Sequence, residues 1–240
     1  MHGTKNCLGT MMLKWLLCSA ALTGLVAVTF GIFPKLDQEI STFFYNQSNG
    51  FYLGKVSVLS AFRELVWNVS ILLFIFCIAG FLFLRLRGGN SKYFEIGILV
   101  YLLGPVLLVN VILKEFWGRA RPSQITDFGG EKMFTPFYEI TNQCASNCSF
   151  VSGEASGATV ILTVTALLTW AYCGARVQII TVGLSTIVLI GSSFLRVGFG
   201  GHFASDVLLS ILFTGLIFFI VIQHHRYRQI FIQATENPNG

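Results

Sequence analysis

Charge is scarce in this chain of 240 residues, because Asp, Glu, Lys and Arg together make up only 11% of it. That is about half the charged fraction of an ordinary soluble domain, which argues against a soluble fold. Apolar residues make up 54%, and the mean hydropathy is +0.70. The net charge of +5 lies mostly in short inter-helix segments and in the motifs below, so it does not indicate nucleic-acid binding. The composition predicts a polytopic membrane protein.

Histidine is also rare, with four in the chain and only His202 away from the termini. Repeats, low-complexity tracts and linkers are missing, so residues 1–240 are expected to form one membrane domain. Cys144 and Cys148 share a polar loop without a nearby histidine, so their C-x3-C spacing is a weak metal signal. A disulfide or two free thiols is the favoured interpretation, and we expect no metal and no cofactor.

Six long apolar runs predict an all-α fold of six transmembrane helices. They cover residues 15–33, 67–84, 94–113, 157–172, 177–195 and 207–222. The first run could also be a signal peptide, but it is long and lacks a clear cleavage site, so a membrane helix is favoured. Helical spacing of Leu36, Ile40, Phe43 and Phe44 predicts a short helix lying in the membrane interface.

Six crossings place both termini on one side of the membrane. Basic residues in the short loops and tail of that side are Arg85, Arg87, Lys92, Arg176, Arg226 and Arg228. A raw count does not separate the two sides, but the basic residues of the other side lie among many more acids. The short loops therefore predict cytoplasmic termini and put the polar segments 114–156 and 196–206 together on the outer face.

The segment from Arg196 to Asp206 combines several groups that can do chemistry. If a helix begins near His202, the i,i+4 spacing stacks Asp206 beneath it. A carboxylate there would hold one ring nitrogen as N–H and leave the other free to attack. Arg196 can pair with an anion across the glycine-rich turn. The alternative is a polar loop that caps a membrane helix, with Asp206 complementing the helix dipole.

A second polar segment follows the third apolar run. Lys114 and Arg121 are seven residues apart, so on a helix their side chains point the same way. Pro122 disfavours helix at Arg121, which places that arginine at the helix end. Two cations at one depth require an anion, although Lys114 alone could anchor to lipid headgroups. Arg119, between them, is either a contact for an anionic substrate or a solvated basic residue.

The fourth apolar run is preceded by Ser152, Gly153 and Glu154. Small residues at a helix N-terminus expose backbone N–H groups to an anion. Ser152 can cap the helix or bind a phosphate oxygen. Glu154 is either a site residue or a carboxylate that complements the helix dipole in the first turn.

Together these three segments resemble the signature of the phosphatidic acid phosphatase type 2 superfamily, K-x6-R-P, P-S-G-H and S-R-x5-H-x3-D, in order across residues 94–222. The first motif matches in full. The third matches in spacing, with Leu195 in place of serine. The second matches only at Ser152 and Gly153, because Val151 replaces proline and Glu154 replaces histidine. Six membrane helices are the family's usual architecture.

The resemblance implies a metal-independent enzyme with a defined role for each residue. His202 would attack phosphorus and form a phosphohistidine, with Asp206 fixing its tautomer. The phosphate would be held by Lys114, Arg121, Arg196, Ser152 and the Gly153 N–H. The family's second histidine protonates the leaving oxygen. Glu154 would do so as a protonated acid, or the leaving group needs little help, or the protein is catalytically impaired.

The segment 147–156, with the aromatic residues before it, resembles the bacterial branch that includes inner-membrane lipid A phosphatases. The expected activity is removal of phosphate from lipid A at the periplasmic face, with loop 123–149 of the polar segment 114–156 recognising the headgroup. Undecaprenyl diphosphate and phosphatidylglycerophosphate are alternative substrates, and transfer to a second lipid is an alternative reaction. A lipid-binding relic or a transporter is the non-enzymatic alternative. A transporter would place ionisable groups in mid-membrane, whereas these spans are nearly uncharged.

Overall fold

The computed structural model describes residues 2–224, 227 and 229, so the tail arginines Arg226 and Arg228 lie outside the described residues. The elements outside the bundle are α2 (Leu36–Thr42), β1 (Tyr45–Asn46), β2 (Gly50–Phe51), η1 (Tyr52–Lys55), η3 (Pro122–Gln124) and η4 (Thr126–Phe128). The bundle itself contains α1 (His2–Ile32), α3 (Ser57–Leu86), α4 (Lys92–Tyr101), η2 (Leu102–Leu113), α5 (Lys114–Phe116), α6 (Gly153–Tyr172), α7 (Ala175–Gly198) and α8 (Ala204–Gln223).

Six helices in the described residues are long and apolar enough to cross a membrane, which confirms the predicted architecture. The third is composite, because α4 runs through η2 into α5. Pro105 lies inside η2 and lacks the amide hydrogen that an α-helix needs. The wider π turns of η2 include this interruption, and Asn110 donates its side-chain amide to the Pro105 carbonyl at 2.7 Å.

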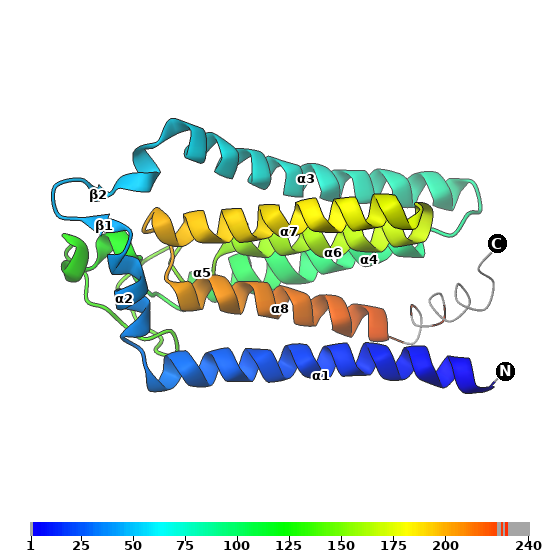
Figure 1. The fold of residues 1–240 in the computed structure, drawn as a ribbon, viewed down its shortest axis with the longest axis horizontal. Coiled ribbons are helices and arrows are strands. Elements are labelled where there is room, and N and C mark those ends of the chain that lie inside the picture. The colour runs from blue at the N-terminus through cyan, green and yellow to red at the C-terminus, as the bar shows by residue number, and fades with distance from the viewer. Residues whose placement is uncertain (1, 225–226, 228, 230–240) are drawn as a thin grey trace.

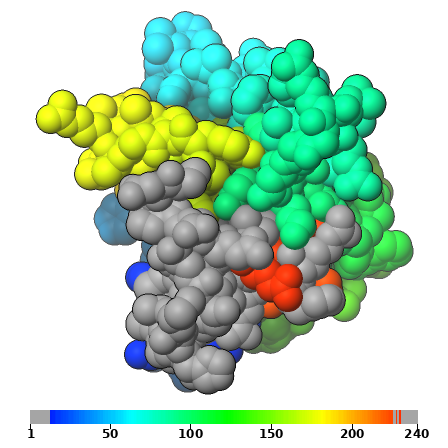
Figure 2. Space-filling model, turned by 90° about the vertical axis from the view of Figure 1, so that its right-hand side faces the viewer, coloured from blue at the N-terminus to red at the C-terminus, as the bar shows by residue number. Residues whose placement is uncertain are grey.

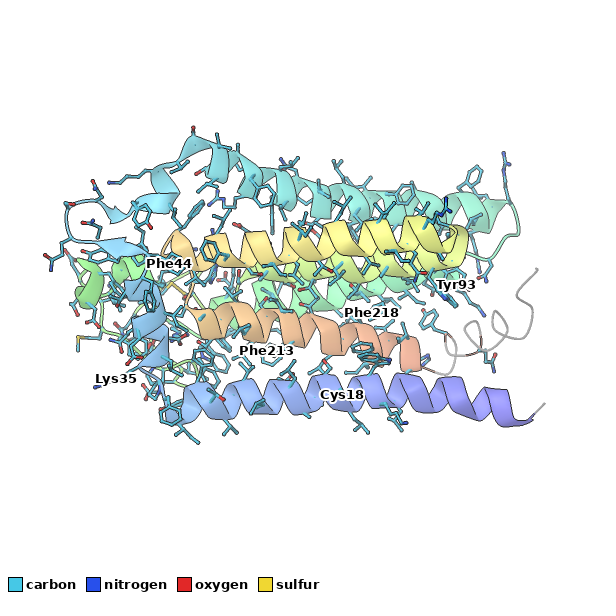
Figure 3. All side chains as sticks on the ribbon, viewed as in Figure 1. Cys18, Lys35, Phe44, Tyr93, Phe213 and Phe218 are labelled. Carbon is cyan, nitrogen blue, oxygen red and sulfur yellow. A yellow bond between two sulfur atoms is a disulfide. The ribbon has the colours of Figure 1, made fainter. Side chains whose placement is uncertain are left out.

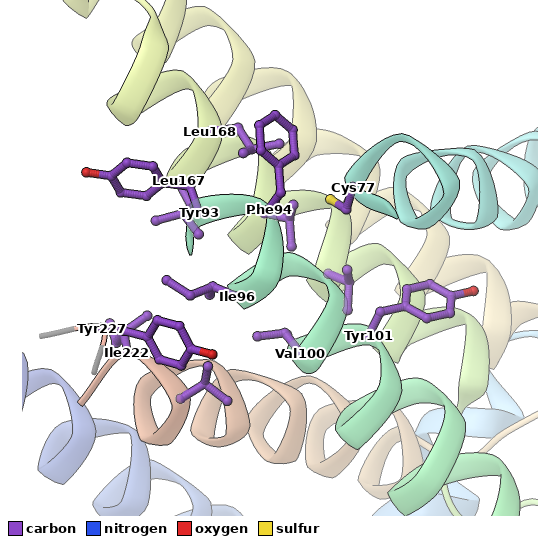
Figure 4. Packing of buried hydrophobic residues seen from close by; sticks show 13 residues of the cluster. Cys77, Tyr93, Phe94, Ile96, Val100, Tyr101, Leu167, Leu168, Ile222 and Tyr227 are labelled. Atoms are coloured by element: carbon purple, nitrogen blue, oxygen red, sulfur yellow. The ribbon is translucent and has the colours of Figure 1, made fainter. Parts of the chain in front are cut away.

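The helices lie nearly side by side, with α1 along α8 and α6 packed against α3, α7 and α8 (Figure 1). The largest group of buried apolar side chains surrounds α4 (Figure 4). It includes Cys77, Tyr93, Phe94, Ile96, Val100, Tyr101, Val160, Val164, Leu167, Leu168, Val221, Ile222 and Tyr227. Many large apolar side chains on the outer faces remain exposed, such as Leu25, Leu72, Ile179 and Ile187. An apolar outer surface of this extent is what lipid contact requires.

The two ends of the bundle differ in construction. One end carries α2, the β1–β2 hairpin and the long loop before α6, with Lys35 and Phe44 near it (Figures 1 and 3). The other end has the short α3–α4 and α6–α7 turns and the end of α8 (Figure 2), and Tyr93 lies there in Figure 3. Polar structure therefore gathers at one end.

Two of the predicted helix boundaries that differ from the structure affect the site. The third helix ends at Phe116 instead of continuing to Arg121, because Gly118 adopts a left-handed conformation with φ of 65°. The second membrane helix begins at Ser57, ten residues before the uncharged run. Its 30 residues span about 45 Å, longer than the ~30 Å hydrocarbon core, so its first turns can carry charge beyond the membrane.

Candidate active site

Residues of all three motifs meet in one cavity of about 550 Å³ at the polar end of the bundle. The lining residues from the motifs are Lys114, Arg121, Gly153, Glu154, Arg196 and His202. The remaining lining residues are Arg63, Glu64, Trp67, Asn68, Asn110 and Asn147, which the sequence motifs did not point to. Ser152, Arg119 and Asp206 are not among the residues that line the cavity.

His202 lies in the turn between α7 and α8, with only 1% of its surface exposed. Its Nδ1 lies 2.5 Å from the carbonyl oxygen of Ser149. A carbonyl can only accept a hydrogen bond, so this contact assigns the proton to Nδ1. The lone pair of Nε2 is then free to act as a nucleophile toward a group in the cavity.

The expected contact between Asp206 and His202 is not formed. Because α8 begins at Ala204, His202 precedes the helix and the i,i+4 geometry does not apply. The Asp206 carboxylate instead accepts hydrogen bonds from the Ser149 hydroxyl at 2.5 Å and the Phe203 N–H at 3.0 Å. Ser149 therefore joins the two residues, with its hydroxyl on Asp206 and its carbonyl on His202.

Arg119 is fully buried, in neither the solvated nor the substrate-facing position expected from the sequence. Its guanidinium pairs with Asp206 at 2.5 Å and with Asp37 of α2 at 2.8 Å. It also donates to the Ser205 hydroxyl and to the Thr135 carbonyl. Burial alone would lower the pKa of Arg119, but the two carboxylates outweigh it and raise the pKa. Arg119 therefore lies outside the cavity lining and holds Asp206 in place through this ion pair.

Two of the cavity cations are oriented by one residue, Asn147. The Lys114 ammonium donates to its side-chain oxygen at 3.1 Å, and the Arg121 guanidinium donates to its carbonyl at 2.7 Å. Asn147 has a φ of 49°, a left-handed conformation that asparagine tolerates better than most residues. The structure joins Cys144 and Cys148 in a disulfide that closes this short loop.

The third cation, Arg196, pairs with Glu154 at 3.3 Å across the cavity wall, and Arg63 approaches the same carboxylate at 3.9 Å. A Cβ at position 201 would lie 2.6 Å from the Arg196 guanidinium, so Gly201 is needed for its position. In the described residues, Arg196 Nε and Glu154 Oε2 are buried without a hydrogen-bond partner. Such atoms have bonding capacity for a polar ligand.

Ser152 and Gly153 form the start of α6. The Ser152 hydroxyl is fully buried and accepts from the Ala155 N–H at 3.3 Å, so it takes the capping role that the sequence allowed. Gly153 faces the cavity, and a Cβ there would lie 3.2 Å from the Lys114 ammonium and 3.3 Å from the Asn110 amide oxygen. Gly153 therefore lets the ammonium approach the helix N-terminus.

The electrostatics of the cavity keep its histidine neutral. Burial lowers the pKa of His202 well below its ordinary value, and the positive charges of Arg196, Lys114 and Arg121 lower it further. Burial also lowers the pKa of Arg121, although arginine remains charged near neutral pH. The cavity thus combines a neutral imidazole, with a free Nε2 lone pair, and a cluster of cations, an arrangement that suits nucleophilic attack on a phosphoryl group. Within the described residues, no group of three His, Cys, Asp or Glu side chains could hold a metal ion.

Comparison with known proteins identifies the family. Residues 95–230 match the family model of the PAP2 superfamily. The chain belongs to the PAP2 superfamily. A lipid A 4'-phosphatase of Francisella tularensis subsp. novicida is 31% identical to this PAP2 chain over 205 residues, covering 81% of the chain and 88% of that protein.

Two further relatives of the PAP2 chain are lipid A 4'-phosphatases of Rhizobium etli and Rhizobium leguminosarum, 39% and 38% identical. Each match covers 54% of the chain and about half of the relative, 48% and 53%. The crystal structure of a transmembrane PAP2-type phosphatidylglycerolphosphate phosphatase from Bacillus subtilis shares the fold, with a TM-score of 0.59, 21% identity and coverage of 86% of this chain and 93% of that one. The predicted family and the phosphatase assignment are confirmed.

Proposed function

We propose that this PAP2 phosphatase removes a phosphate from lipid A through a phosphohistidine on His202. The observation that carries the proposal is the cavity itself, in which a buried neutral imidazole faces three cations. The substrate follows from the relatives, since three lipid A 4'-phosphatases are 31–39% identical to this chain. The phosphatidylglycerolphosphate phosphatase is only 21% identical and supports the fold alone.

In the first step, the lone pair of His202 Nε2 forms a bond to phosphorus while the bond from phosphorus to the lipid oxygen breaks. The leaving oxygen takes a proton from the Glu154 carboxyl, which the bound phosphoryl group displaces from Arg196. Lys114, Arg121 and Arg196 hold the phosphoryl oxygens and neutralise the charge of the transition state. The N–H of Gly153 at the start of α6 adds a backbone donor.

In the second step, a water attacks the phosphohistidine and gives its proton to the Glu154 carboxylate. The bond between phosphorus and His202 breaks, inorganic phosphate leaves, and both side chains return to their starting states. The cations supply the positive charge that a metal ion provides in other phosphatases. We therefore expect the reaction to proceed in the presence of EDTA.

The proposed orientation follows from charge. At the end opposite the cavity, the short α3–α4 and α6–α7 turns and the helix ends beside them carry Arg85, Arg87, Lys92 and Arg176. By the positive-inside rule this end is cytoplasmic, so both termini are cytoplasmic and the cavity opens at the periplasmic face of a bacterial inner membrane.

The test is phosphate release by detergent-purified protein from lipid A, undecaprenyl diphosphate, phosphatidylglycerophosphate and phosphatidic acid, each with EDTA present. We expect the highest kcat/KM on lipid A and no loss of rate with EDTA. A higher kcat/KM on another lipid would overturn the assignment of lipid A as the substrate. Loss of activity with EDTA and its return with a divalent cation would overturn the metal-independent mechanism.

A further inference from the structure

The cavity has a second wall that none of the three motifs supplies. Arg63, Glu64, Trp67 and Asn68 of α3 line it, and we call these four residues the α3 wall. The 63/67 and 64/68 pairs are each four residues apart, so the four side chains form one stripe on the helix. The family match begins at residue 95, so the α3 wall lies outside the segment that carries the shared phosphatase chemistry.

The α3 wall faces the phosphate-binding cations across the same cavity. Arg63 joins the two sides, because it approaches Glu154 at 3.9 Å and Glu64 at 4.0 Å. A substrate whose phosphate sits among the cations would therefore place the adjoining part of its headgroup against α3. The wall contacts whatever the phosphate is attached to.

The chemistry of the α3 wall suits a sugar ring. Trp67 is 37% exposed and offers a flat apolar face, while Asn68 and Glu64 are exposed beside it. A pyranose has an apolar C–H face that packs on an indole and a rim of hydroxyl or amide groups that need hydrogen-bond partners. Binding sites that orient small ligands combine an aromatic surface with a few polar groups in this way.

We propose that the α3 wall binds the phosphate-bearing sugar ring of a phosphoglycolipid, with Trp67 packed on the ring and Asn68 and Glu64 bonded to its polar substituents. This inference rests on the proposed function, because it names the part of the site that selects a glycolipid. The competing explanation is that Trp67 only anchors α3 in the membrane interface, where tryptophan is common.

The test uses water-soluble headgroups, which separate ring binding from membrane anchoring. Inhibition by glucosamine phosphate and by glycerol phosphate is measured during turnover of whichever lipid the wild type hydrolyses. The variants are Trp67→Ala and Trp67→Phe, and the matched control is Trp15→Ala, which removes an exposed tryptophan from α1.

We expect the wild type to bind glucosamine phosphate roughly tenfold more tightly than glycerol phosphate, as one good aromatic contact allows. Trp67→Ala should abolish this preference and leave glycerol phosphate inhibition within about twofold, while Trp67→Phe keeps most of the preference and Trp15→Ala keeps all of it. Equal inhibition of the wild type by both compounds, or a preference that survives Trp67→Ala, would overturn the inference. Failure of the wild type to release phosphate from lipid A would overturn the proposed function instead. That assay uses no Trp67 variant, so the two failures can be distinguished.

Discussion

The buried charges behind the cavity make a quantitative prediction for Arg119→Met. The Arg119 side chain is 0% exposed, and its partners Asp37 and Asp206 are 2% and 0% exposed. Methionine keeps much of the side-chain volume but leaves two buried carboxylates without a cation. Removing one partner of a buried ion pair typically costs about 3–5 kcal/mol in the free energy of unfolding.

For a protein of this size, 1 kcal/mol corresponds to roughly 2–4 °C in Tm, so the expected decrease for Arg119→Met is roughly 6–20 °C. The assay is thermal unfolding of purified protein in detergent, followed by intrinsic fluorescence. Lys132→Met is the control, because it removes an exposed cation from the same loop. Adding Asp37→Asn to Arg119→Met should recover part of the loss, since it removes one of the two carboxylate charges. A Tm for Arg119→Met within about 3 °C of the control would refute the reasoning.

Further predictions concern the chemistry of the cavity. Glu154→Gln should lower the rate roughly 10²-fold or more if Glu154 is the acid, and near-wild-type turnover would remove that role. Burial and the cations lower the pKa of His202, so the histidine stays neutral until the pH falls well below its ordinary pKa of about 6.5. A plot of kcat/KM against pH should therefore show no decrease centred near ~6.5 on its acid side. A decrease centred there would contradict the assignment of a neutral histidine. Cys148→Ser opens the loop that orients Asn147 and should raise KM more than it lowers kcat, whereas Cys173→Ser, outside that loop, should change neither. A Cys148→Ser KM equal to that of Cys173→Ser would contradict the positioning role of the disulfide.

Much of the architecture could be predicted because each membrane helix appears in the sequence as a long run of apolar residues. Six apolar runs are sufficient to predict six spanning helices, and the spacing of three motifs is sufficient to predict the family. The same rule failed where a helix carries charge. The uncharged run begins at Trp67, after Arg63 and Glu64, whereas α3 begins at Ser57. Because the predicted helix left out Arg63 and Glu64, the α3 wall could not be predicted from the sequence.

The site contained contacts that local spacing could not reveal. The i,i+4 rule linked Asp206 to His202 only on the assumption that the helix includes His202, and α8 starts two residues later. Asp37 lies 82 residues from Arg119 in sequence, and nothing local distinguishes it from Glu39 on the same short helix. Asn147 begins the segment 147–156, but nothing in that segment predicts its contacts with Lys114 and Arg121. Pairings of this range depend on the tertiary fold.

The measurement that tests the central claim most directly is phosphate release by the wild type beside His202→Ala, purified in the same detergent and assayed on the lipid that the wild type hydrolyses best. The account predicts that His202→Ala loses roughly 10⁴-fold or more in kcat while it remains folded at the assay temperature, since the nucleophile is gone and the cations remain. Turnover by a folded His202→Ala variant within tenfold of the wild type would contradict the account, because some other group would then have to attack phosphorus.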